Sequence, residues 1–217
     1  MTKTPGPTQA KLGITLDQVV DAAFAVLHRD GIAKLSTRAI AGELGVRMNT
    51  VMWHIGTKDR LLELMAEAIM GEVDLDNLRG GWREQVAEVL RRLRQAMLAH
   101  RDGASIIAGT FPVEPNTLAF ADRVLSLLFE GCPTRKSAAW TSWSLFYFTL
   151  GLVQEEQAPP AAFHDRLRES MAEQHFPALR AVAEDYLSID YTERFHFGIE
   201  QILRSAPTVR PRRRSDR

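Results

Sequence analysis

Cysteine is nearly absent from this sequence, and so are long apolar runs. Cys132 is the single cysteine among 217 residues, so the chain can form neither an internal disulfide nor a cysteine-based zinc site, as is usual in a reducing cytoplasm. No stretch approaches the length of a membrane span, and the first residues lack an apolar signal segment. We therefore expect a cytoplasmic protein with no membrane partner.

Recognisable catalytic patterns are missing as well. The sequence has no nucleophile beside a paired base, no cluster of metal ligands and no glycine-rich phosphate loop, and its 6 histidines are scattered without ligand spacing. An enzyme is therefore the least favoured class. We expect no catalytic residue, no metal site and no cofactor.

Strand-like alternation of polar and apolar residues never continues beyond a few residues, and no segment repeats. Apolar residues recur instead at helical spacing, which predicts an all-α protein. Breaks in that pattern predict a flexible segment over residues 1–13, a three-helix head over 14–60, a larger helical body over 61–204 and a disordered basic tail over 205–217.

The net charge of zero hides an uneven distribution. Residues 1–60 hold 8 Lys and Arg against 5 Asp and Glu, a net charge of +3, and residues 204–217 hold 6 against 1, a net charge of +5. The 13 basic and 21 acidic residues between them give −8. Basic ends beside an acidic middle are expected if only part of the chain meets nucleic-acid phosphates.

The stretch from Leu35 to Lys58 predicts two short helices joined by a tight turn. Ser36 is an N-cap candidate for the first helix, and Gly45 supplies the unusual backbone conformation that ends it. The second helix runs from about Arg47 to Trp53, with Val51 turned inward. Two helices that cross steeply over a short turn form a helix-turn-helix.

The helix expected before this pair covers residues 15–30. Thr15 and Gln18 form a capping-box pattern at its start. A further helix begins after Thr57, whose side chain can cap it, and leads from the head into the body. We expect this helix to be the mechanical link between the two.

The second helix of the pair carries short or forked hydrogen-bonding side chains with no acidic residue among them: Arg47, Asn49, Thr50 and His54. In the major groove, arginine pairs with guanine, asparagine pairs with adenine, and threonine can contact the thymine methyl. Lys58 and the amides beside Thr57 can hold a DNA phosphate. These features predict a DNA-reading helix. A small helical hairpin with a solvated polar face is the structural alternative.

The helix predicted from Thr134 to Gln157 is rich in aromatic residues on two neighbouring faces. Both faces must be covered, either by the core of the chain or by a second subunit, and a twofold DNA site favours a dimer. The last helix, over 190–204, is the natural companion. We expect the dimer interface to contain Phe146, Leu150, Val153, Phe195, Ile199 and Ile202.

Aromatic side chains accompanied by a few polar groups also suit a cavity for an apolar ligand. The candidates on the long helix are Trp140, Trp143, Ser144 and Tyr147. Aromatic residues at helical spacing are more often packed core than pocket, so core packing is the alternative for each of them.

Several short motifs of the head occur together in one family: Leu27-His-Arg-Asp-Gly31, Leu35-Ser-Thr-Arg38, Leu44-Gly-Val46, Trp53-His54, Lys58 and Leu61-Leu62. With these residues, the head resembles the DNA-binding domain of the tetracycline-repressor (TetR) family. The body motifs His100-Arg-Asp-Gly-Ala104, Gly109-Thr110 and Phe148-Thr-Leu-Gly151 resemble those of the tetracycline repressors in that family. The resemblance extends from about residue 15 to residue 157.

The resemblance implies which residues meet DNA. The positions that lie at the DNA in the tetracycline repressors match Thr37, Arg38, Arg47, Met48, Asn49, Thr50, Met52, His54 and Lys58. Met48, Asn49 and Met52 depart from the residues of those repressors. The operator sequence is therefore expected to differ.

The ligand positions depart further from the family pattern. Ile107 stands where the tetracycline repressors have the histidine that holds the magnesium of their drug chelate, and isoleucine cannot ligate a metal. The other drug-contact positions carry Asp74, Val89, Leu93, Phe111, Arg123 and Tyr147, while Thr110 and Glu155 are retained. We expect a hydrophobic or aromatic ligand, such as a drug or natural product, that binds without metal.

The resemblance thus implies a homodimeric repressor that binds a palindromic operator and leaves it when a small-molecule effector binds the body. The rival from another class is a ligand-independent DNA-binding dimer, an activator or architectural protein whose body only dimerises. A ligand-sized cavity in the body would favour the first reading, and a solid body would favour the second.

Overall fold

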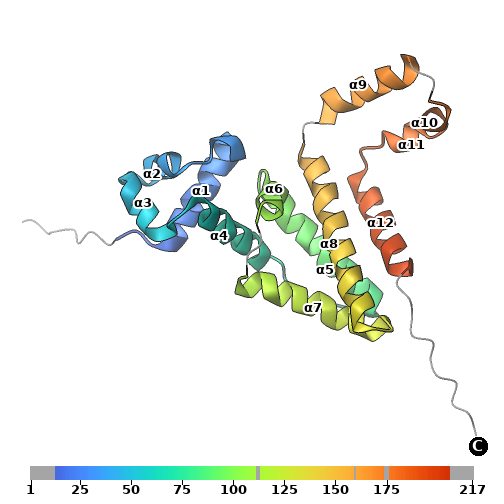
Figure 1. Cartoon of the computed structure of the whole chain (residues 1–217), viewed down its shortest axis with the longest axis horizontal. Coiled ribbons are helices and arrows are strands. Elements are labelled where there is room, and N and C mark those ends of the chain that lie inside the picture. The colour runs from blue at the N-terminus through green and yellow to red at the C-terminus, as the bar shows by residue number, and fades with distance from the viewer. Residues whose placement is uncertain (1–12, 111–112, 159, 174–175, 206–217) are drawn as a thin grey trace, which may run out of the picture. The chain divides into compact units, whose positions relative to one another are not determined.

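The computed structural model describes residues 13–110, 113–158, 160–173 and 176–205. Every regular element in these ranges is helical (Figure 1), so the predicted all-α fold class is confirmed. The chain divides after Leu61 into two compact units, residues 1–61 and 62–217, which are called the head and the body below. Except for Gly13 and Ser205, the predicted flexible segment and basic tail lie outside the described residues.

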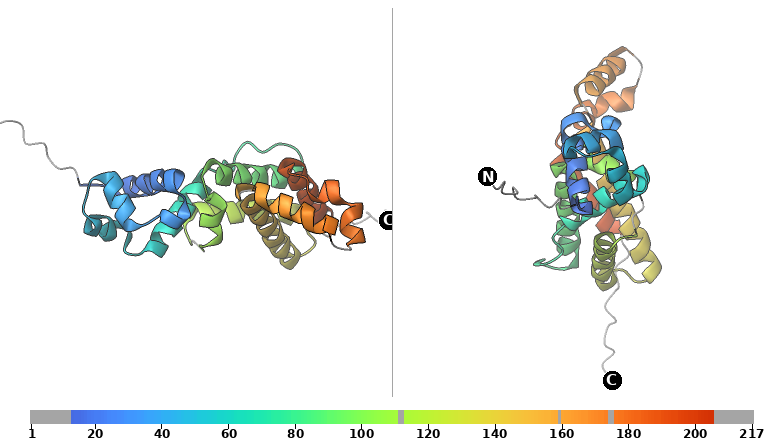
Figure 2. Two further views of the ribbon diagram at one scale, coloured as in Figure 1. Left: turned by 90° about the horizontal axis from the view of Figure 1, so that it is seen from above. Right: turned by 90° about the vertical axis from the view of Figure 1, so that its left-hand side faces the viewer.

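Between residues 13 and 57, the described part of the head contains three helices and one short 3₁₀ turn: α1 (Leu16–Asp30), η1 (Ile32–Lys34), α2 (Thr37–Leu44) and α3 (Met48–Ile55). The predicted capping box at the start of α1 is confirmed, because the Thr15 hydroxyl accepts from the Gln18 amide and the Gln18 side chain accepts from the Thr15 amide. Both α2 and α3 pack against α1 (Figure 2). The core between them is aliphatic and includes Val19, Val26, Leu27, Ile40 and Val51.

The turn between α2 and α3 has the predicted chemistry. The Ser36 hydroxyl accepts from the Ala39 amide at 3.2 Å and caps α2. Gly45 ends α2 in the left-handed region, with φ of 64°, which glycine adopts without steric cost. The Val46 amide then donates to the Ala41 carbonyl at 3.0 Å. These contacts fix the direction in which α3 leaves the turn.

Helix α4 (Lys58–Gly71) runs across the division between the two units. The Thr57 hydroxyl caps it, accepting from the Arg60 amide at 3.0 Å. The helix ends at Gly71. Its apolar stripe is buried and consists of Leu61, Met65, Ala66, Ile69 and Met70.

The body is built around α5 (Trp82–Ala99), α7 (Pro115–Gly131), α8 (Arg135–Gln157) and α12 (Tyr191–Ser205). Helix α5 packs on α7, α8 and α12, and α7 packs on α8. The short helix α6 (Gly103–Ala108) lies against α5 and α8. Helices α9 (Pro160–Glu173), α10 (Pro177–Ala181) and α11 (Ala183–Tyr186) connect α8 to α12 (Figure 1).

Two glycines allow helices of the body to approach closely. A Cβ atom on Gly198 of α12 would lie 2.0 Å from the ring of Phe148 on α8. A Cβ atom on Gly131 would lie 2.0 Å from the ring of Trp82. Any side chain at either position would have to displace an aromatic ring, so both contacts depend on glycine.

Candidate DNA-binding and effector sites

Helix α3 divides its residues between the core and the solvent. Val51 is fully buried and Ile55 is 2% exposed, and these two side chains hold the helix on the head. Arg47, Met48, Asn49 and Thr50 are all exposed at its N-terminal end. An exposed, polar N-terminal end is the part of a recognition helix that reaches base edges.

Trp53 was not among the residues predicted to meet DNA, yet it is the most open aromatic side chain of α3. It is 80% exposed, and its ring meets the His54 imidazole edge to face with 4.7 Å between centroids. The helical period of the sequence could have revealed that Trp53 is exposed. Because Val51 and Ile55 face the core, the residue midway between them must face away from it.

The remaining predicted DNA residues surround this surface. The Thr37 hydroxyl on α2 lies 3.6 Å from the Met52 sulfur on α3, and both side chains are partly buried. Arg38, Arg47 and Lys58 are exposed, and none of the three has an acidic partner among the residues that the structure describes. Unpaired surface cations of this kind are available to phosphates.

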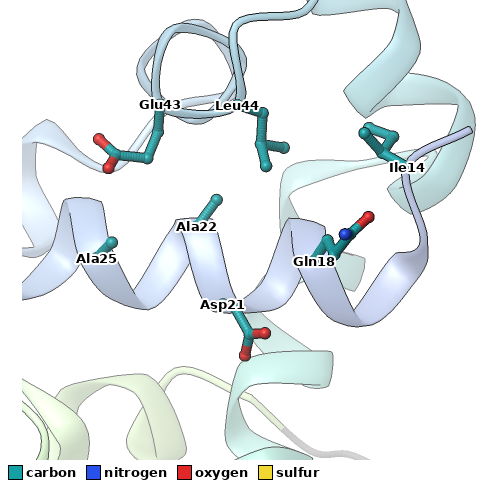
Figure 3. Close-up of a pocket in the computed structure, with 7 residues that line it drawn as sticks. All are labelled: Ile14, Gln18, Asp21, Ala22, Ala25, Glu43 and Leu44. Carbon is teal, nitrogen blue, oxygen red and sulfur yellow. The ribbon is translucent and has the colours of Figure 1, made fainter. Parts of the chain in front are cut away.

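A groove of about 440 Å³ lies between α1 and α2. Figure 3 shows Glu43 and Leu44 on the α2 side and Asp21 on the far side of α1. Glu43 is already engaged, because its carboxylate lies 2.6 Å from the Arg29 guanidinium. The groove contains no residue predicted to bind DNA or an effector: its lining is Ile14, Gln18, Asp21, Ala22, Ala25, Glu43 and Leu44.

The predicted effector residues fall into three environments in the body. Val89, Leu93, Ile107 and Thr110 are buried. Asp74, Trp140, Trp143, Ser144, Tyr147 and Glu155 are exposed, and Arg123 is intermediate. Phe111 lies outside the described residues. The effector set thus contains core positions and surface positions together.

Most of the polar residues in that set already have partners within the chain. The Asp74 carboxylate lies 3.0 Å from the Arg92 guanidinium. The Thr110 hydroxyl donates to backbone carbonyls of α6. Both oxygens of Glu155 accept from Arg194, at 2.7 and 3.0 Å, and this pairing raises the pKa of the arginine.

Three side chains predicted for the dimer interface lie in the core of the single chain. Val153, Phe195 and Ile199 are at most 2% exposed, so the expectation that they face a second subunit is corrected here. The reason is that α12 packs directly on α8, which covers one of the two apolar faces of α8. Leu150 is also buried, while Phe146 and Ile202 are half-buried.

Aromatic rings remain exposed on the other face of α8. Trp143 stacks on Tyr147 with 5.3 Å between centroids and an interplanar angle of 20°. The Lys136 ammonium lies 4.4 Å above the ring of Trp140. On α12, Phe197 is 64% exposed. Large apolar side chains gathered on a surface mark a binding or subunit interface.

Polar contacts that sequence reasoning missed tie α4 to the rest of the body. The Glu67 carboxylate accepts from the backbone amides of Asn116 and Thr117, at 2.6 and 3.1 Å, and from the Thr117 hydroxyl at 2.9 Å. A carboxylate at the first turn of α7 is favoured by the helix dipole. Just beyond α4, the Glu72 carboxylate lies 2.7 Å from His100 Nε2.

Gln157 performs a similar role at the end of α8. Its amide nitrogen donates to the carbonyls of Met97 and His100, at 2.9 and 2.8 Å, and its oxygen accepts from the Ala104 amide at 3.0 Å. Asp102, in the same turn, adopts a positive φ of 57°. The α5–α6 turn is therefore fixed by one side chain of α8.

Within the described residues, no three His, Cys, Asp or Glu side chains gather closely enough to hold a metal ion. No helix in these same ranges has the length and apolar character needed to cross a bilayer.

Family models match both units of the chain. Residues 19–65 match the model of bacterial regulatory proteins of the tetR family, and residues 76–205 match the model of the tetracyclin repressor-like C-terminal domain. The chain belongs to the TetR family. The head therefore has the family's helix-turn-helix and the body its C-terminal domain.

Relatives in the TetR family cover most of the chain. The class G tetracycline repressor protein of Vibrio anguillarum is 32% identical over 190 residues, 85% of this chain and 90% of that protein. The class A protein from transposon 1721 of Escherichia coli is 38% identical over 143 residues, 64% of this chain and 66% of that protein. The crystal structure of ActR from Streptomyces coelicolor in complex with actinorhodin superposes with a TM-score of 0.80 at 30% identity, covering 90% of this chain and 96% of ActR.

Proposed function

We propose that the protein is a cytoplasmic, homodimeric repressor that binds a palindromic operator and is released from it by a small aromatic effector. The observation that carries this proposal is the division of α3, where Val51 and Ile55 anchor the helix while Arg47, Asn49 and Thr50 stand exposed. Family membership adds the expectation of DNA binding in the head and ligand binding in the body.

In the proposed complex, α3 enters the major groove. Arg47 is suited to guanine, Asn49 to adenine and Thr50 to either a base edge or the thymine methyl. Met48, Met52 and Trp53 offer apolar contact beside them. Arg38, His54 and the Thr37 hydroxyl approach from the same surface, and Lys58 meets a phosphate at the start of α4.

A palindrome requires two heads related by a twofold axis, with α3 helices about 34 Å apart. Phe197, exposed on α12, and half-buried Ile202 on the same helix offer apolar side chains for a second copy. Phe197→Glu should therefore give a monomer in sedimentation experiments. Tyr186→Glu, a matched change at another exposed aromatic residue, should leave the dimer intact.

The effector site is proposed on the body around α6, α7 and α8. Ile107 is 6% exposed and presents only alkyl carbon, so the residue that would anchor a magnesium chelate is unsuitable for that role. ActR, which has been solved in complex with actinorhodin, supports a small-molecule effector. Chelation of divalent ions should therefore leave the effector response unchanged.

Release is proposed as a population shift. The effector needs only to bind more tightly to a state in which the heads no longer match successive grooves. Helix α4 is the element that both units share, and Glu67 joins it to the first turn of α7. A change near α6 and α7 therefore has a direct route to α4.

The deciding experiment is selection of an operator from random DNA by the purified protein, followed by titration of Arg47→Ala and Asn49→Ala. Each should weaken binding by about 1–3 kcal/mol and relax specificity at one base position. Arg135→Ala, an exposed arginine on α8, is the matched control. Failure to enrich any palindrome would overturn the proposal.

The alternative function is a ligand-independent DNA-binding dimer. It is favoured by the packing of Val89, Leu93, Ile107 and Thr110 into the core. Under this alternative, the wild-type operator complex would survive every aromatic compound that binds the body.

A further inference from the structure

Several partly buried arginines of the body are paired with carboxylates. Arg91 and Arg92 share Glu88, at 2.7 and 2.8 Å. Arg94 lies 2.7 Å from Glu156, and Arg194 lies 2.7 Å from Glu155. Arg83, which is also partly buried, lies 4.2 Å over the Trp82 ring instead, so each of these guanidinium groups has a partner.

Arg123 on α7 departs from that rule. Its side chain is partly buried, and its Nε is shielded from solvent without a hydrogen-bond partner in the described residues. No carboxylate of those residues forms an ion pair with it. A buried N–H donor without a hydrogen-bond partner costs free energy, so such a donor usually has one.

The position of Arg123 on α7 is next to the core-facing side. Val124 follows it, and Phe120 and Leu127 lie about one turn away in each direction, all three of them buried. Helix α7 packs on α5 and α8. The Arg123 cation therefore lies at the edge of an otherwise apolar part of α7.

A series of aromatic ring contacts begins at Phe120, about one turn before Arg123 on α7. Phe120 on α7 lies 6.5 Å from Phe146 on α8 between ring centroids. Phe146 in turn contacts Trp143 at 6.2 Å and Tyr147 at 6.0 Å. This chain of rings leads from the turn before Arg123 to the open stack of Trp143 and Tyr147 on α8.

We propose that Arg123 is the specificity-determining residue for an acidic group on an aromatic effector. The inference rests on the proposed function, since it requires an effector in the body, and it adds the chemical class. The guanidinium presents donors in a planar fork that matches a carboxylate or another organic oxyanion. The rings of Phe146, Trp143 and Tyr147 accommodate the attached aromatic system.

The proposal also states what the site rejects. A neutral aromatic ligand of the same shape leaves the Arg123 donor without a partner, and an aromatic amine places a second cation beside the first. Discrimination by an unpaired donor is steeper than discrimination by shape alone. The charge of the ligand should therefore matter more than its ring count.

The test uses anthraquinone-2-carboxylate and its carboxamide as a matched probe pair, with affinity measured by calorimetry on the full dimeric protein. The wild type should bind the carboxylate at least about tenfold more tightly than the amide, as expected for a hydrogen bond to a charged group. Arg123→Gln should abolish that preference without weakening the amide. Arg123→Lys should retain part of it, since the charge remains but the fork is lost.

Arg135→Gln, an exposed arginine on α8, is the control and should leave the preference unchanged. Equal affinities for the two probes in the wild type, a preference that survives Arg123→Gln, or no carboxylate binding up to its solubility limit would each overturn the inference. Operator binding by the same preparations separates the two proposals. A wild type that binds its operator but shows no charge preference fails only the inference about Arg123.

Discussion

The head and the body distribute their predicted functional residues in opposite ways. In the head, core and contact residues are different side chains of the same helix: Val51 is buried, while Asn49 and Thr50 are exposed. In the body, the predicted effector residues include core positions such as Leu93 and ion-paired positions such as Glu155. A rigid external partner such as DNA can be met by one exposed surface, whereas a small ligand must be enclosed by several elements.

This difference teaches how far substitution can separate function from stability. The exposed contact residues of α3, such as Asn49 and Thr50, can be changed with little effect on folding, because their side chains are not part of the core. The same experiment in the body removes packing or an ion pair together with any ligand contact. The most informative tests compare two neighbouring residues, one of them buried and the other more exposed.

The largest effect is expected at Glu156. Glu156→Ala would leave Arg94, which is 8% exposed, without its carboxylate. Breaking a buried ion pair in this way costs about 3–5 kcal/mol. Glu155→Ala breaks the neighbouring, more exposed pair with Arg194 and should cost less than about 1 kcal/mol. Denaturant unfolding of both variants measures the difference, and equal costs would show that burial does not separate the two pairs.

Adjacent residues of α3 provide the next comparison. Val51→Ala creates a cavity in a fully buried site and should lower the free energy of unfolding by about 2 kcal/mol. Thr50→Ala changes an exposed side chain and should cost less than about 0.5 kcal/mol, while weakening operator binding. Thermal unfolding and DNA titration of the two variants measure these effects. A larger loss of stability in Thr50→Ala than in Val51→Ala would contradict the division of α3 into core and contact residues.

A loss of comparable size is expected at the α4–α7 junction. Glu67→Ala removes three hydrogen bonds to the first turn of α7 and should cost about 1.5–3 kcal/mol, since the acceptor is charged and partly exposed. Thr117→Val removes one of those bonds, the one that the Thr117 hydroxyl donates to Glu67. If the two residues act through their contact, the effects of the two changes on unfolding will be less than additive.

Acidification gives the smallest effect. Hydrogen bonds from Arg91, and to a lesser extent from Arg92, lower the pKa of Glu88 from 4.5 to about 2. A depressed carboxylate pKa contributes stability above the unfolded-state pKa, and that stability is lost as the pH falls from about 4.5 toward 2. After allowance for solvent screening, the contribution is at most about 1 kcal/mol. Glu88→Gln should flatten this part of the stability profile.

Sequence patterns predicted the head well because its signals are local. The capping box of Thr15 and Gln18, the N-cap at Ser36 and the left-handed glycine at position 45 each specify backbone geometry within a few residues. Trp53 was missed because it was treated as part of the family motif, although the period of α3 exposes it.

The body was harder to predict because its contacts join distant residues. Both faces of α8 are apolar, so the sequence could not decide which face α12 would cover, and Val153, Phe195 and Ile199 were assigned to the wrong neighbour. The Glu67 contact joins residues separated by 50 positions. No local pattern marks a carboxylate that binds the end of another helix.

The turn at Gly45 also has a consequence for engineering. Its hydrogen bonds run between backbone atoms of Ala41, Gly42, Gly45 and Val46, so the direction of α3 is set without any side chain that faces outward. A library that randomises positions 48, 49, 50 and 53 therefore varies only solvent-facing chemistry. The head is a scaffold on which new operator preferences can be selected while the fold stays the same.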